Sequence, residues 1–201
     1  MSTTAIVLIV VLAVIVLGVL AFFAVDQAKR RRLRSRFGPE YDRVLETSKD
    51  RRTAERELAD RERRHRQLDL RPISPADREQ YTQQWAQVQE RFVDDPERAV
   101  HEADQLVMVL MQARGYPAGS FDQRAAHLSV EHGGTIGQYR EAHELLTRHE
   151  QGDGTSTEDL RAALLHYRTL VRDLLKAGST RQPEPAGDTT TDATTRRSER
   201  V

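Results

Sequence analysis

The hydrophobic positions follow three patterns along the chain: one continuous run, one nearly polar stretch and several helical stripes. The run covers residues 5–25, which carry no charge and are almost all aliphatic or aromatic. As a helix with a rise of 1.5 Å per residue, such a run extends roughly 30 Å, the thickness of the hydrocarbon core of a bilayer. It therefore predicts one transmembrane helix, after a short segment at residues 1–4.

The flanks of this run distinguish an anchor from a cleaved signal. A secretory signal begins with basic residues, has an apolar stretch of about 7–15 residues and ends at a small-residue cleavage site. Here the chain begins with MSTT, and Val19-Leu20-Ala21, the best cleavage site, lies inside the apolar run. We expect a signal-anchor that stays in the membrane; the alternative is cleavage and export.

Basic residues follow the run, and none precedes it. They are Lys29, Arg30, Arg31, Arg32, Arg34 and Arg36. Because Lys and Arg beside a span stay on the cytoplasmic side, they predict a single-pass cell-membrane protein with its N-terminus outside and its remaining chain in the cytoplasm. The same side chains are candidates for binding anionic lipid headgroups of the bilayer, at about 1 kcal/mol each. The simpler alternative is that they only set the topology.

Residues 26–71 contain few apolar side chains and many charges. Pairs such as Glu57 and Arg61 stand four apart with the acid first, the order that stabilises a helix. A heptad counted from Tyr41 soon meets Arg52, so a sustained apolar seam is missing. We expect a basic juxtamembrane segment followed by a charged, solvated helical stalk. A weak homo-oligomer through a coiled coil of this stalk is the alternative.

Residues 72–178 repeat apolar side chains at steps of three and four, which is typical of amphipathic helices. An N-cap residue precedes each of five stripes. These caps are Ser74, Asp95, Ser120, Thr135 and Ser156. No stretch longer than a few residues alternates with period two. The pattern predicts an all-α protein with a compact bundle of four or five helices in this region.

Composition adds three constraints. Residues 179–201 are rich in Thr, Pro and charge, with one aliphatic side chain larger than Ala, so we expect a disordered tail. Residues 26–71 contain 16 Lys and Arg against 10 Asp and Glu, whereas residues 72–178 contain 11 against 17. Because phosphates need a positive surface, the acidic bundle argues against a nucleic acid partner. The chain has no cysteine, which excludes disulfides, thiol nucleophiles and thiolate metal ligands.

The strongest metal candidate is the trio Glu97, His101 and Asp104, spaced i, i+4 and i+7. On a helical wheel these residues point away from the apolar row of their helix, so we interpret them as a solvated charged face. The glycines of HGGTIGQ (132–138) lack the context of a phosphate loop and fit a helix break followed by a capped helix. We therefore expect no catalytic residue, no cofactor and no metal site.

Tyr81, Trp85 and Phe92 fall on one stripe of the first bundle helix. Packing in the core is the favoured interpretation. The alternative is an aromatic interface for a protein partner, because large rings often carry the binding energy of interfaces.

Residues 71–175 contain the segments RPISPADREQYTQQWAQVQERFVDDPERAVHEADQLV, MQARGYP, FDQRAAHLSVEH, YREAH and TEDLRAALLHYRTLV. In these segments the chain resembles a family of uncharacterised membrane-anchored proteins of actinobacteria and related bacteria. The resemblance implies a single anchor before a helical domain, and it implies no activity, cofactor or catalytic residue.

Three functions fit these observations. The favoured one is a membrane-tethered helical protein-interaction module, a scaffold or adaptor for an unknown protein partner. A structural or lipid-organising envelope protein acting through the basic stalk is the second, and an enzyme that uses His and carboxylates is the third.

Overall fold

The structure is a computed structural model that describes the backbone of residues 3–177 and the side chains from residue 12 onward. The tail expected to be disordered, residues 179–201, lies outside the described residues. Within the described range the chain forms eight helices and no strand, which confirms the all-α prediction. The helices are α1 (Thr3–Phe37), α2 (Pro39–Thr47), α3 (Arg51–His65), α4 (Pro75–Asp94), α5 (Pro96–Ala113), α6 (Phe121–Glu131), α7 (Ile136–Glu150) and α8 (Thr157–Lys176).

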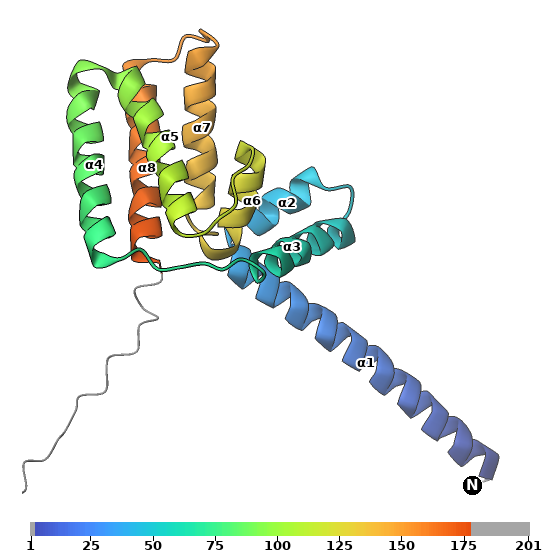
Figure 1. The fold of residues 1–201 in the computed structure, drawn as a ribbon. Coiled ribbons are helices and arrows are strands. Elements are labelled where there is room, and N and C mark those ends of the chain that lie inside the picture. The colour runs from blue at the N-terminus through green and yellow to red at the C-terminus, as the bar shows by residue number, and fades with distance from the viewer. Residues whose placement is uncertain (1–2, 178–201) are drawn as a thin grey trace, which may run out of the picture.

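Helix α1 projects from the body of the molecule as a single rod of 35 residues (Figure 1). Its large apolar side chains between Leu12 and Val25 are exposed, so they form a belt that the rest of the described chain leaves uncovered. A contiguous apolar surface of this size requires an apolar environment. This helix is long and apolar enough to cross a membrane.

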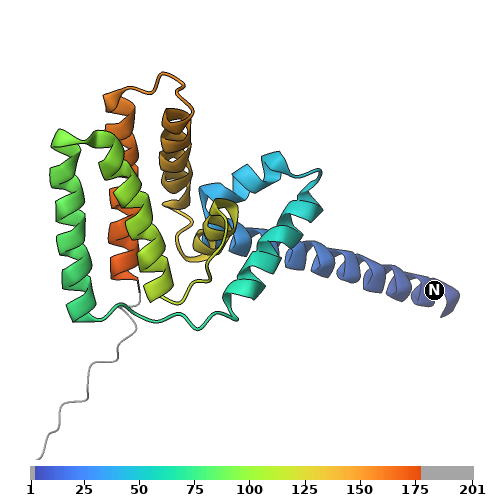
Figure 2. The same ribbon diagram turned by 45° about the horizontal axis from the view of Figure 1, so that its top comes forward.

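Helices α4, α5, α7 and α8 form the bundle, with α4 packed on α5, α5 on α8 and α8 on α7 (Figures 1 and 2). The shorter α6 lies at one end, next to the base of α1. The core is built from the apolar stripes predicted from the sequence. Its most deeply buried large side chains include Leu110, Leu128, Tyr139, Tyr167, Leu170 and Leu174.

Four of the five predicted caps are confirmed. The side chains of Ser74 and Asp95 accept hydrogen bonds from backbone N–H groups in the first turns of α4 and α5, and Ser120 and Ser156 open capping boxes. The prediction for Thr135 is wrong. Its backbone is already helical, and its hydroxyl group donates outside α7 instead of accepting from it. The turn from α6 continues almost directly into α7, so the N-cap geometry is lost.

The segment predicted as a charged stalk is helical and charged, but it does not extend into solvent as one helix. It folds into the end of α1, α2 and α3, which pack together and on α6 (Figure 2). A second apolar cluster holds them, formed by Leu33, Phe37, Tyr41, Val44, Ala54, Leu58 and Val130. These apolar residues come from four helices, α1, α2, α3 and α6, so no single heptad repeat contains them. The chain turns at Gly38, where φ is +52°, before α2, and α3 begins after its N-cap Asp50.

Candidate functional site

The candidate site is the junction where α1 enters the folded domain. Leu33 and Phe37, in the last turns of α1, are 2% and 0% exposed. They pack in the second cluster with Leu58 of α3 and Val130 of α6. Burying a Leu or Phe side chain stabilises a fold by about 1.5–3 kcal/mol. Because the helix is unbroken between the apolar belt and these side chains, α1 and the domain form one mechanical unit.

Two glycines allow the end of α1 to meet the α6–α7 turn. Gly38 ends α1 with a positive φ, a backbone conformation that glycine adopts without strain. A Cβ atom on Gly133 would lie 2.7 Å from the carbonyl oxygen of Phe37, closer than a real contact allows. Gly133 belongs to the HGGTIGQ segment. Its role is therefore a close backbone approach between this turn and α1.

Half of the basic residues predicted for topology or lipid binding also fasten α1 to its neighbours. The ion pairs join Arg30 to Glu55, Arg32 to Glu62, and Arg34 to Asp42. The two glutamates belong to α3, and their side chains are only 6% and 14% exposed. The other three basic residues are exposed and form no ion pair with any residue between 12 and 177: Lys29, Arg31 and Arg36. The junction thus has a structural set of cations and an unpaired set.

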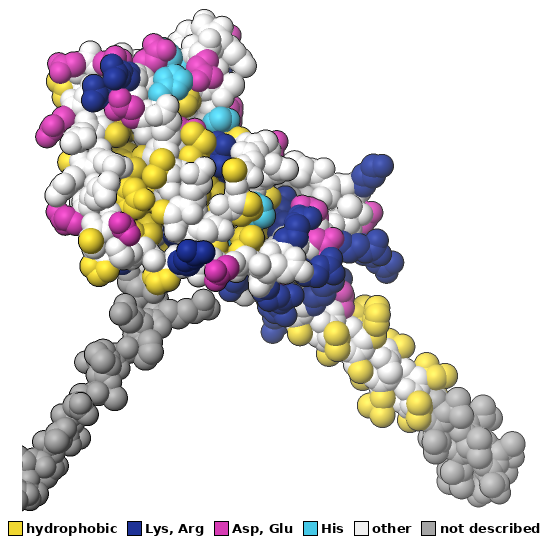
Figure 3. Space-filling view, in the orientation of Figure 1, with side chains coloured by type: hydrophobic (Ala, Val, Ile, Leu, Met, Phe, Trp, Pro, Cys, Tyr) yellow, Lys and Arg dark blue, Asp and Glu magenta, His cyan; other side chains and the backbone are white. Residues whose placement is uncertain are grey.

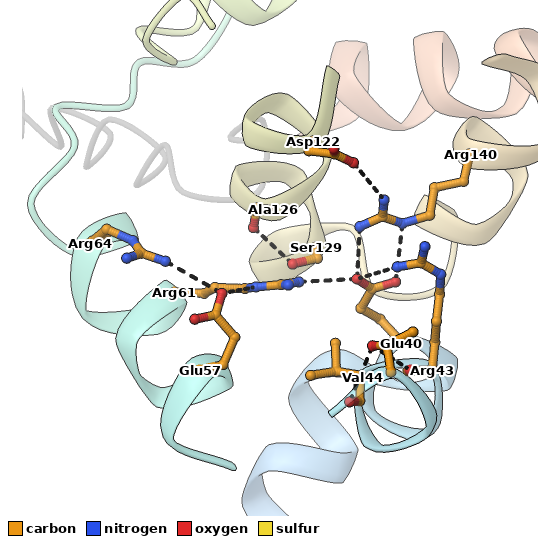
Figure 4. Close-up of polar contacts among 11 residues, drawn as sticks. Glu40, Arg43, Val44, Glu57, Arg61, Arg64, Asp122, Ala126, Ser129 and Arg140 are labelled. Carbon is orange, nitrogen blue, oxygen red and sulfur yellow. Dashed lines mark hydrogen bonds and ion pairs between the residues drawn. The ribbon is translucent and has the colours of Figure 1, made fainter. Parts of the chain in front are cut away.

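Glu40 is the most buried carboxylate of the junction, at 2% exposed, and three arginines surround it (Figure 4). It accepts hydrogen bonds from Arg61 Nη1 of α3 at 3.0 Å and from Arg140 Nη2 of α7 at 2.9 Å. Arg43 Nη1 lies at 3.8 Å. Glu40 stands in the first turn of α2, where the helix dipole favours a negative charge. This single carboxylate joins α2, α3 and α7.

A second polar cluster lies between α3 and α6. Glu131 accepts hydrogen bonds from Arg114 Nη2 at 3.1 Å and from the Tyr116 hydroxyl at 3.2 Å, and His65 Nε2 lies 3.8 Å from its other oxygen. Burial lowers the pKa of His65, and the charge of Glu131 opposes that shift only in part. Burial alone would raise the pKa of Glu131, but Arg114 and the neighbouring histidines lower it below its usual value.

A third contact ties the α6–α7 turn to α8. Asp173 Oδ2 lies 2.8 Å from His132 Nδ1 and accepts a hydrogen bond from the Thr135 hydroxyl at 3.0 Å. The contact with His132 is the main reason that the pKa of Asp173 lies below its usual value. The Thr135 hydroxyl group, which we expected to cap α7, instead donates to Asp173.

A shallow groove of about 420 Å³ opens between α2, α6 and α7. Phe121 and His143 stack at its edge with ring centroids 3.7 Å apart, and burial lowers the pKa of His143. Arg140 contributes to the wall, but its guanidinium is already bound to Glu40. The wall also contains Asp122, so its charges partly compensate one another. We assign no chemistry to this groove.

The aromatic residues considered as a partner interface pack in the bundle core. Trp85 and Phe92 are 7% and 8% exposed, and Tyr81 packs against the same core while half-buried. The Arg161 guanidinium lies 5.5 Å from the centre of the Phe92 ring and covers it. This burial favours the core interpretation of the stripe over a partner interface.

The trio Glu97, His101 and Asp104 does not converge. Glu97 faces His149 at 3.3 Å, and His101 faces Glu150 at 3.6 Å. The expectation that Asp104 points to solvent is wrong, because its side chain is 14% exposed and lies beside Arg124 of α6. The helical-wheel prediction used one apolar row of α5 to define its buried face. Helix α7 also packs on α5, so more of the α5 surface is covered than that row indicates. Within the described part of the chain, no three His, Cys, Asp or Glu residues are placed to hold a metal ion.

Sequence reasoning missed Glu40, His65 and Gly133. The Gly38-Pro39 pair before Glu40 is a helix-start signal that could have placed this acid in a first turn. No local signal connects Glu40 with Arg140, which stands 100 residues further along the chain.

Comparisons of the chain with family models, curated proteins and solved structures give no match. Membership of the actinobacterial family therefore stays a prediction, and function has to be inferred from the geometry of the chain itself.

Replacing Glu40 by Gln should lower the free energy of unfolding by about 3 kcal/mol, because Arg61 and Arg140 lose the buried carboxylate that they share and keep only the more exposed Glu57 and Asp122. Unfolding of the full chain in mild detergent, followed through the fluorescence of its single tryptophan, Trp85, measures the effect. Glu158→Gln is the matched control: its side chain is 80% exposed and pairs with Arg161, so the loss should stay below about 1 kcal/mol. Equal, small losses in both variants would show that the Glu40 cluster does not hold α2, α3 and α7 together.

Stability should fall as the pH drops from 7.5 to 5.5, partly through His65. The unfolded chain protonates this histidine near its ordinary pKa of about 6.5, whereas the folded chain does so only at lower pH, so protons favour unfolding in this window. Unfolding free energies of the wild type and of His65→Gln at the two pH values measure the effect. The variant should lose less stability than the wild type between the two pH values. The loss that remains in the variant should come from His127 and His143, because burial lowers their pKa values too. Identical losses in the two proteins would contradict this assignment.

Proposed function

We propose that the chain is a membrane-tethered interaction module, a scaffold or adaptor that presents its helical bundle to a protein partner at a fixed orientation beside the bilayer. The observation that carries the proposal is the continuity of α1, which runs from the apolar belt into the buried cluster at Leu33 and Phe37. A protein that needed only membrane attachment would gain nothing from burying the end of its anchor. A module that must face its partner in a defined direction would.

The buried polar groups support a module of this kind. Glu40, Glu131 and Asp173 each connect two or more helices, so a structural role accounts for each. Glu131 and Asp173 lie in neighbouring clusters that both contact or sense His132, and Glu40 belongs to another cluster. None of the three acids lines the groove between α2, α6 and α7. Within the described residues, the acidic bundle lies on the far side of the domain from the apolar belt of α1 (Figure 1), and it is the surface that we assign to the partner.

We place this bundle in the cytoplasm, because every basic residue near the apolar belt follows it. A tag after Val201 should then resist protease in cells stripped of their wall and be digested once the membrane is lysed. A periplasmic or extracellular protein with the same tag shows that the protease is active. Digestion of the tag in intact cells would overturn the orientation and direct the search to partners outside the cell.

The fixed orientation can be tested by inserting seven residues between Gln27 and Ala28, before the buried end of α1. A flexible Gly/Ser insert uncouples the span from the domain. A helical Ala/Glu/Lys insert of the same length keeps the rod and rotates it by only about 20°. A photo-crosslinking residue in place of Val93, which is 83% exposed on α4, reports the partner in cells.

The wild type should give a discrete crosslinked partner. The variant with the helical insert should give several-fold more of this crosslinked product than the variant with the flexible insert. Equal capture by the two inserts would reduce α1 to a simple tether. Failure to crosslink any specific partner from the bundle surface would overturn the proposed function itself.

A further inference from the structure

Helix α3 lies close to the level at which α1 leaves the bilayer. It contacts α1 through the pairs Arg30–Glu55 and Arg32–Glu62. The two arginines stand five and seven residues beyond Val25, the end of the apolar belt, or roughly 7–10 Å along the helix axis. Lipid headgroups occupy about 5–7 Å of each side of a bilayer, and the Debye length adds about 8 Å in physiological salt. Helix α3 is therefore within electrostatic reach of the headgroups.

The contacts of α3 show which of its faces is turned away from the bundle. Arg61 binds Glu40, which binds Arg140 of α7, so this face of α3 is turned to the bundle. At 100° per residue, the opposite face contains Arg52, Arg56 and Arg63, which lie within about 40° of one another. We name these three residues the arginine stripe.

The arginine stripe is available for a ligand. All three side chains are exposed, and Arg52 and Arg56 form no ion pair with any residue between 12 and 177. Arg63 pairs only with its neighbour Asp60 on the same helix. Lys29 and Arg31 of α1 are exposed and equally unpaired. Figure 3 shows the result: dark blue side chains gather where the yellow span meets the body of the molecule.

We propose that the arginine stripe, together with Lys29 and Arg31, docks on the anionic headgroups of the leaflet from which α1 emerges. The ligand follows from position: a bilayer-spanning α1 delivers a phosphate-rich surface to this face at a high effective concentration. The apolar residues of α3 are buried on the opposite side, so the contact is electrostatic and shallow, without insertion into the acyl chains. The inference rests on α1 spanning the bilayer and is independent of a protein partner.

The test uses the full chain in nanodiscs of phosphatidylcholine alone or with about a third phosphatidylglycerol. Because the chain has no cysteine, Ala59→Cys places a single fluorophore beside the arginine stripe. A quencher attached to lipid headgroups reports how closely α3 approaches them. Quenching should be at least twofold stronger in the anionic discs, and the difference should disappear in 0.5 M salt, where the Debye length is only a few ångströms.

The double variant Arg52→Gln, Arg56→Gln should lose most of the additional quenching that anionic discs produce, which we call the anionic increment. Arg168→Gln with Arg172→Gln, an exposed pair with the same i, i+4 spacing on α8, is the matched control and should keep it. The helical seven-residue insert between Gln27 and Ala28 provides a second variant that leaves α3 untouched but raises it by roughly 10 Å, and it should also lose the increment.

Equal quenching in neutral and anionic discs, or full quenching in the Arg52/Arg56 variant, would overturn the proposal. Circular dichroism of the variants confirms that they are folded. This result is distinguishable from a failure of the interaction module, because the nanodisc measurement contains no partner and the crosslinking measurement does not depend on lipid charge.

Discussion

The structure depends on one constraint: α1 exposes an apolar belt long enough to cross a membrane and, without a break, buries Leu33 and Phe37 in the domain. A helix that ended at the membrane surface would leave the domain free to rotate. Here the last turns supply part of the second apolar cluster, so the chain has to reverse immediately afterwards. Gly38 makes the reversal possible, and Gly133 lets the backbone of the α6–α7 turn close against it. The position of α2, and with it Glu40, follows from this reversal.

Charge has two roles in the junction, and burial separates them. Glu40 and Glu55 are almost fully buried and bind arginines from other helices, so removing one of these acids takes the buried partner from those cations and leaves them only more exposed carboxylates. Lys29 and Arg31 remain in solvent, where an ion pair contributes little. The cluster that sequence reasoning treated as one basic signal is thus divided. Arg30, Arg32 and Arg34 shape the domain, and the unpaired cations remain for an external anion.

The sequence was sufficient to predict a structural feature wherever the interactions that cause it lie within a few residues of one another. The limits of α4, α5 and α8 follow from capping residues and apolar spacing within a few positions, and the apolar run identifies α1. The fold-back of residues 26–71 could not be predicted in this way, because Phe37, Tyr41 and Leu58 belong to three helices and form a cluster only after the chain turns. Thr135 shows the same limit at the scale of one side chain. Its sequence context fits an N-cap, but its hydroxyl group donates a hydrogen bond to Asp173, 38 residues away.

The order of charges along the chain also makes physical sense beside a bilayer. Residues 26–71 carry an excess of six positive charges over negative ones, and residues 72–178 carry six more negative than positive ones. An anionic leaflet would attract the first set and repel the second, and both forces decay within about one Debye length. A flexible tether would let the acidic bundle tumble against the surface. In the proposed membrane-tethered arrangement, α1 is rigidly joined to the domain, so the basic layer would stay between the bilayer and the bundle. The field of the membrane would then reinforce the orientation that packing at Leu33 and Phe37 sets.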